Sequence, residues 1–134
     1  MTYSELKILT RALLSSDFPL PEDDESIKAL LKMAYKHLAN RCQVLNLQTE
    51  DKSAHILRLG RGKHMVRMPE LPTSDDDILD IDDELCDAAA CLIASYISEK
   101  KIMVHKANAE EIINSYNAKV DEFLETYAEG IDND

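Results

Sequence analysis

The stretch that decides the fold is residues 82–100, DDELCDAAACLIASYISEK. Its first carboxylates, Asp82, Asp83 and Glu84, favour the positive N-terminal end of a helix dipole, and Lys100 favours the negative C-terminal end. The alanines between them have the highest intrinsic helix propensity. Because the middle is apolar on nearly every side, the sequence predicts a central helix that other elements surround.

Two amphipathic helices are predicted before this central helix. Thr2 and Glu5 have the spacing of a capping box, and apolar residues follow at helical spacing up to Ser15. The acidic, proline-containing segment 16–25 predicts a loop. Ser26 is then the expected cap of a second helix that ends near Asn40.

A last helix is predicted after a short break at residues 104–108. It begins at Ala109 and carries a continuous apolar stripe that includes Tyr116 and Val120. We expect Gly130 to end this helix and residues 129–134 to form a flexible acidic tail.

Between the second helix and the central helix, the hydrophobic period falls towards two. The segments SAHILRL and KHMVRM flank Gly60, Arg61 and Gly62, which is the pattern of two strands and a tight turn. The sequence therefore predicts a β-hairpin over residues 53–68, with Val44–Leu47 as a candidate third strand. The expected fold is mainly α, a four-helix domain with a β-hairpin insertion between the second and third helices.

Size and composition narrow the classes of function. A chain of 134 residues is expected to form a single domain, residues 1–134. The net charge of −11 argues against a general nucleic-acid-binding surface. The odd number of cysteines, Cys42, Cys86 and Cys91, predicts buried free thiols in a reducing compartment. With no long apolar run, we expect a soluble intracellular protein.

Charge is distributed unevenly along the chain. Residues 53–69 contain four basic residues and no acid, whereas residues 70–87 contain nine acids and no base. Each run is explained either as a solvated surface or as one half of a contact between copies, where opposite charges set the register. A third reading is that Arg61 and Lys63 touch phosphates. The candidate interface residues are Arg58, Arg61, Lys63, His64, Arg67, Asp75, Asp76, Asp77 and Asp80.

Motifs that would indicate chemistry do not match. In a calcium-loop frame from Asp75 to Cys86, an aspartate stands where glycine is needed and a cysteine where glutamate is needed. His37 and Cys42 are not placed by any nucleophile turn, so an ordinary helical histidine is the simpler reading. We therefore predict no catalytic residues, no cofactor and no metal site, and we expect a protein that is not an enzyme.

The order of these elements resembles a known family. The segments MPELPTSDDDILDIDDEL, LCDAAACLIASYIS and EEIINSYNAKVDEFLETY follow two helices and a hairpin. In this order, the chain resembles the head-to-tail connector, or neck adaptor, proteins of tailed bacteriophages. The resemblance covers most of the chain. It depends on the order of the elements and on the residue pattern D-D-E-L … A-A … A-S-Y in residues 82–96.

The resemblance implies a non-enzymatic protein of the virion neck that is assembled in the host cytoplasm. It implies a ring, commonly of twelve copies, which lies between portal and tail and extends the DNA channel without recognising DNA. Further neck or tail proteins are the other implied partners. The implied portal-docking residues are Phe123, Leu124, Tyr127 and Ile131. The alternative function is a small cytoplasmic regulatory module whose basic hairpin binds an acidic partner or nucleic acid.

Overall fold

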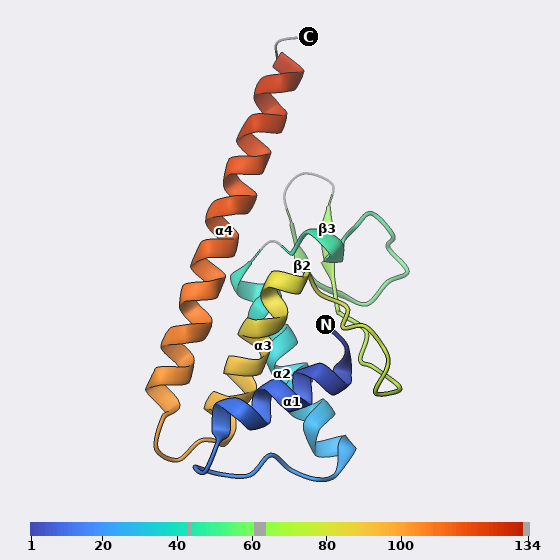
Figure 1. Ribbon diagram of the computed structural model, residues 1–134. Helices are drawn as coiled ribbons and strands as arrows, with labels where there is room; N and C mark the ends of the chain where they lie inside the picture. Colours follow the sequence, from blue (N-terminus) through green and yellow to red (C-terminus); the bar gives the residue numbers. More distant parts are fainter. Residues whose placement is uncertain (43, 61–63, 133–134) are drawn as a thin grey trace.

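Helix α3 (Asp83–Ile97) is the central element of the fold, as predicted. The computed structural model describes residues 1–42, 44–60 and 64–132, and the side chains up to Phe123. Within this part of the chain, α3 packs against α4, α1 and α2. Figure 1 shows α3 in the middle of the helical body, with α4 running beside it in the opposite direction. The alanines of α3 let these helices approach closely, and four of them are fully buried: Ala88, Ala89, Ala90 and Ala94.

Helix α1 (Tyr3–Leu14) begins with the predicted capping box. The Glu5 amide donates to Thr2 Oγ1 at 3.2 Å, and the Thr2 amide donates to Glu5 Oε1 at 3.4 Å. These reciprocal bonds satisfy amides that the first turn of a helix leaves without partners. The helix buries Tyr3, Leu6, Thr10 and Leu14.

Helix α2 (Asp24–Arg41) ends where predicted but begins earlier. The prediction that Ser26 is the cap is wrong, because Asp23 is the N-cap and its Oδ2 accepts the Ser26 amide at 3.0 Å. A carboxylate three residues before an amide has the ideal reach for this bond, so the acidic end of the preceding loop starts the helix.

The hairpin prediction is confirmed. Strands β2 (Ile56–Leu59) and β3 (Met65–Arg67) pair antiparallel, with Leu59 opposite Met65. The third strand lies slightly later than predicted: Leu45–Leu47 forms a 3₁₀ turn, η1, and β1 (Gln48–Thr49) pairs with β3. The strand order in the described residues is β1-β3-β2. Arg61 and Gly62 of the predicted turn, and Lys63 after it, lie outside the described residues.

Helix α4 (Ile102–Asp132) differs most from expectation. It begins seven residues before Ala109 and passes through the predicted break, and Gly130 does not end it. Two contacts account for the early start: Ser98 Oγ accepts the Lys101 amide at 2.9 Å, and Asp17, from the loop after α1, accepts the amides of Glu99 and Lys100. The bond to Lys101 caps the start of the helix, and the two bonds to Asp17 fix the turn that precedes it.

The hydrophobic core draws on every helix and on the sheet. Leu6, Leu31, Leu85 and Ile113 contribute from the four helices of the described chain, and Val66 contributes from β3. The prediction of buried free thiols is confirmed for Cys42, Cys86 and Cys91. None of the described helices combines the length and the apolar character needed to span a membrane.

Candidate functional site

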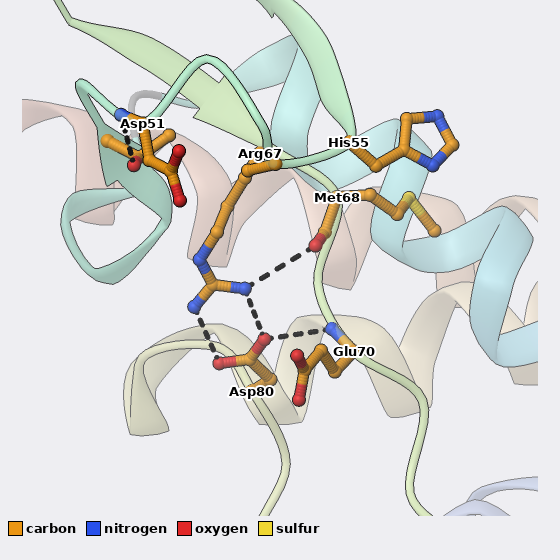
Figure 2. Close-up of a pocket in the computed structure, with 8 residues that line it drawn as sticks. Asp51, His55, Arg67, Met68, Glu70 and Asp80 are labelled. Carbon is orange, nitrogen blue, oxygen red and sulfur yellow. Dashed lines mark hydrogen bonds and ion pairs between the residues drawn. The ribbon is translucent and has the colours of Figure 1, made fainter.

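The basic hairpin and the acidic linker meet within one chain. Arg67 of β3 forms a bidentate ion pair with Asp80, with Nη1 to Oδ2 at 2.5 Å and Nη2 to Oδ1 at 2.9 Å. Figure 2 shows the guanidinium pointing from the sheet onto this carboxylate. Both side chains are about one quarter exposed, at 26% and 25%. Bidentate geometry makes this one of the stronger kinds of ion pair.

Asp80 collects further donors around the same pair. Its Oδ2 accepts the Glu70 amide at 2.8 Å, and its backbone oxygen accepts Asn46 Nδ2 at 3.0 Å. Partial burial by itself would raise the pKa of Asp80, but the bonds from Arg67 and the Glu70 amide outweigh it and lower that pKa. Asp80 therefore joins the sheet, the linker and the segment around η1 through its carboxylate and its backbone oxygen.

A polar cleft of about 570 Å³ surrounds this ion pair. His55, Asp51 and Glu70 are exposed at its edge, and Figure 2 shows the His55 ring directed away from the ion pair. Asp51 Oδ1 already accepts the Ser53 amide and hydroxyl. Since the cleft's one described guanidinium is held by Asp80, the arrangement acts as a structural joint.

Arg58, a predicted interface residue, caps the end of a helix. Its Nε donates to the Ala39 carbonyl at 2.6 Å, and its Nη2 donates to the Cys42 carbonyl at 2.8 Å. The last carbonyls of α2 lack helical partners, and a cation there also suits the negative end of the helix dipole. Arg58 therefore attaches the hairpin to its own helical body.

Most of the predicted acidic interface also has partners inside the chain. Asp75 Oδ1 pairs with Lys7 Nζ at 2.6 Å. Asp77 accepts the amides of Thr73 and Ser74, which lowers its pKa to about 2. Backbone bonds from Tyr3 and Leu79 hold this linker against the N-terminus. Asp76 is exposed on the same turn.

Several residues predicted to form a contact between copies are therefore engaged within their own chain. Arg58, Arg67, Asp75, Asp77 and Asp80 bond within one chain, although sequence analysis expected the two runs to meet between copies. His64 is exposed. Arg61 and Lys63 lie outside the described residues, so the predicted tip of the hairpin stays a prediction.

The far half of α4 extends away from the helical body. Figure 1 shows α4 continuing past the N-terminal end of α3, with the C-terminal turns of α4 free of the other helices. Val120 is buried, but Phe123, three residues later, is 58% exposed. The other predicted portal-docking residues, Leu124, Tyr127 and Ile131, lie on this extension, and their side chains are outside the described part. We call residues 121–132 the α4 arm.

A groove that the sequence did not predict lies at the base of the α4 arm. It has a volume of about 390 Å³ and an apolar floor formed by Leu45, Tyr116, Val120 and Phe123. Tyr116 sets the geometry, since its hydroxyl donates to Asp82 and accepts the Leu45 amide at 3.1 Å. Burial, followed by the bond to Asp82, raises the pKa of the Tyr116 hydroxyl. The helical spacing of Tyr116, Val120 and Phe123 places them on one face of a helix. It does not show that η1 packs against that face.

Over residues 1–42, 44–60 and 64–123, no three His, Cys, Asp or Glu side chains are placed to hold one metal ion. His37 Nε2 lies 3.2 Å from Glu110 Oε1, and Arg41 bonds to the other oxygen of that carboxylate. These residues tie α2 to α4.

Comparisons with protein-family models, with curated proteins and with solved structures found no match to this chain.

Proposed function

We propose that this chain is a non-enzymatic structural adaptor that forms a ring in the neck of a tailed bacteriophage. The ring would lie between the portal and the tail and extend the channel for DNA. The order of two helices, a hairpin insertion, a buried alanine-rich helix and a long last helix supports this proposal. The resemblance of the sequence to neck adaptor proteins depends on that same order.

The α4 arm is the observation that carries the proposal. At 1.5 Å per residue, the twelve residues after Val120 carry the helix about 18 Å beyond this residue, the last buried side chain in the described part of α4. Most helical stability in proteins comes from packing of an apolar face, so an extended helix with an exposed Phe123 is suited to a partner. We assign the portal to the arm, with Phe123, Leu124, Tyr127 and Ile131 as the docking residues.

The charge of the chain agrees with a passive channel. A net charge of −11 disfavours binding to the phosphates of passing DNA. Two of the hairpin arginines, Arg58 and Arg67, are also bonded to their own chain. The alternative function is a basic hairpin that binds an acidic partner or nucleic acid. It is less well supported, because these two arginines are already engaged within the chain.

Native mass measurement tests the proposal. The purified chain is measured alone and after mixing with the portal protein of the same phage. We expect portal-dependent rings, because closed symmetry and many contacts stabilise individually weak interfaces. A monomer that ignores the portal would contradict the proposal and favour the small interaction module.

A pair of variants tests the arm itself. Phe123→Asp places a charge on the arm, and Met33→Asp places one on α2, where Met33 is 52% exposed. Both should retain the thermal unfolding temperature of the unmodified chain, since exposed sites tolerate substitution. We expect only Phe123→Asp to lose binding to the portal. Equal binding by both variants would remove the arm from the interface.

A further inference from the structure

The start of α4 exposes an apolar surface flanked by lysines. Met103 is 75% exposed and Val104 is 54% exposed, and Ile102 beside them is also exposed. Lys101 and Lys106 are exposed on the same two turns, and neither forms an ion pair with a described residue. We call residues 101–104 and 106 the α4 start patch. Consecutive exposed apolar residues of this size are typical of an interaction surface.

The patch is held in a defined position. His105, which interrupts it, is buried, so this turn is anchored to the body while its neighbours face outward. Asp17 fixes the preceding corner by accepting the amides of Glu99 and Lys100 and the Ser98 hydroxyl. Asp17 also lies near the charge of Lys100, and Glu99 is the exposed acid beside it. Of the lysines at this corner, Lys101 and Lys106 are the two without an ion-pair or charge partner among the described residues.

The groove at the base of the α4 arm has the opposite charge. Its rim carries the carboxylates of Asp82, Asp83 and Glu84 and the ammonium of Lys119. Asp83, whose side chain is 86% exposed, also pairs with the N-terminal ammonium of Met1 at 2.7 Å. Lys119 pairs with Glu84 at 3.2 Å, and both side chains are more than half exposed. Exposed pairs of this kind exchange partners at little cost. The groove thus combines an apolar floor with a rim on which carboxylates outnumber cations.

We propose that copies of this chain associate head to tail, with the α4 start patch of one copy seated in the groove of the next. This inference rests on the proposed ring and names its subunit contact. Met103 would enter the apolar floor, where an unbranched and flexible side chain adapts to an irregular space. Lys101 and Lys106 would face Asp83 and Glu84 at the rim, where charge sets the register.

The spacing of the two surfaces determines the kind of assembly. Met103 and Val120 are seventeen residues apart on one helix, or about 25 Å. Because the patch and the groove are different surfaces, every copy uses each of them once. Such a contact is heterologous, and it closes into a ring when the rotation between copies permits.

Charge reversal in matched pairs tests the contact. Lys101→Glu with Lys106→Glu reverses the patch, and Asp83→Lys with Glu84→Lys reverses the rim. Each reversed chain alone should need about tenfold more protein to assemble, as like charges then face each other. An equimolar mixture should regain assembly, since the reversed patch fits the reversed rim. Lys32→Glu with Lys36→Glu, on the exposed face of α2, is the control that should assemble normally.

Cross-linking gives a second measurement. A chain with Met103→Cys and Phe123→Cys should form disulfide-linked multimers under mild oxidation, and the chain with Met33→Cys and Phe123→Cys should not. The native thiols interfere little, because burial raises the pKa of Cys42 to about 11 and that of Cys86 to about 12, and Cys91 is also buried. Within one chain, positions 103 and 123 lie about 30 Å apart on α4, too far for a disulfide.

The outcomes separate this inference from the proposed function. Rings that form with the portal but ignore both reversals, without cross-links between positions 103 and 123, would overturn the patch-and-groove contact and leave the adaptor function in place. Absence of assembly in the unmodified chain, with and without the portal, would overturn the adaptor function. Rescue by mixing would support both.

Discussion

Arg67 and Asp80 form a bidentate ion pair that fastens the β-hairpin to the linker before α3, with both contacts within 2.9 Å. The pair is mostly shielded from solvent, and Asp80 also accepts the Glu70 amide. Asp80→Asn removes the charge that compensates the guanidinium. Because a partly buried cation then lacks its partner, we expect the free energy of unfolding to fall by about 1–3 kcal/mol.

Urea unfolding of the Asp80→Asn variant measures this loss. The matched control is Lys119→Gln, which removes an exposed pair with Glu84 and should change stability by less than about 0.5 kcal/mol. If the two variants are equally stable, the Arg67–Asp80 pair does not hold the hairpin to the body.

Asp77 predicts a dependence of stability on acid pH. Its carboxylate accepts bonds from Thr73 and Ser74, which lower its pKa from 3.8 to about 2. A pKa lower in the folded state stabilises the protein above the unfolded value, and the contribution disappears as pH falls through the folded value. The stability difference between the unmodified chain and Asp77→Asn should therefore shrink as pH falls from 3.8 to about 2.

Carboxyl chemical shifts followed by NMR would measure the pKa of Asp77 directly. Asp76, on the same turn, has an exposed side chain and serves as the internal comparison. A titration of Asp77 near pH 4, the range of an ordinary aspartate, would contradict the bonding seen at this turn.

Tyr116 predicts a local effect where η1 meets α3 and α4. Its hydroxyl donates to Asp82 and accepts the Leu45 amide, so Tyr116→Phe leaves two partly buried groups without a partner. We expect a loss of about 1–2 kcal/mol in stability. Faster amide exchange should be concentrated at Leu45 and at the first turn of α3.

Tyr96→Phe is the control for this variant. Tyr96 is only partly buried and forms no side-chain hydrogen bond with another described residue. Its removal should leave exchange around η1 unchanged. An equal loss of protection in both variants would mean that the effect does not depend on the Tyr116 bonds.

The alanines of α3 predict a strong effect of added volume. Ala90 is fully buried in the central helix, so Ala90→Leu forces extra methylenes into a filled space and should cost about 1–3 kcal/mol. Ala107→Leu makes the same change at an exposed position of α4 and should be nearly neutral. Thermal unfolding compares the two, and a neutral Ala90→Leu would show that α3 is less closely packed than its burial indicates.

The main elements were readable from the sequence because local signals and burial agree there. The apolar run of α3 and the capping box of Thr2 and Glu5 each specify a structure without help from distant residues. Where a distant group decides, the prediction was wrong. Helix α4 begins early because Asp17, more than eighty residues before it, accepts the amides of the corner.

The candidate site was harder to predict for the same reason. Counting charges found the basic and acidic runs, but the number of charges does not show that Arg58 caps α2 or that Arg67 meets Asp80 in the same chain. The groove at the base of the α4 arm combines η1, α3 and α4. Only the folded arrangement brings Leu45 and Phe123 to the same groove.

The way α4 is attached has a mechanical consequence. Its packed half lies against α3 in the opposite direction, and the other half extends beyond the body (Figure 1). A pull along the free end therefore loads the whole α3–α4 seam in shear, so its contacts resist together and do not open one after another. A sideways force on the same end acts as a lever whose fulcrum lies near Val120, where a small displacement of the tip becomes a tilt of the helix against α3.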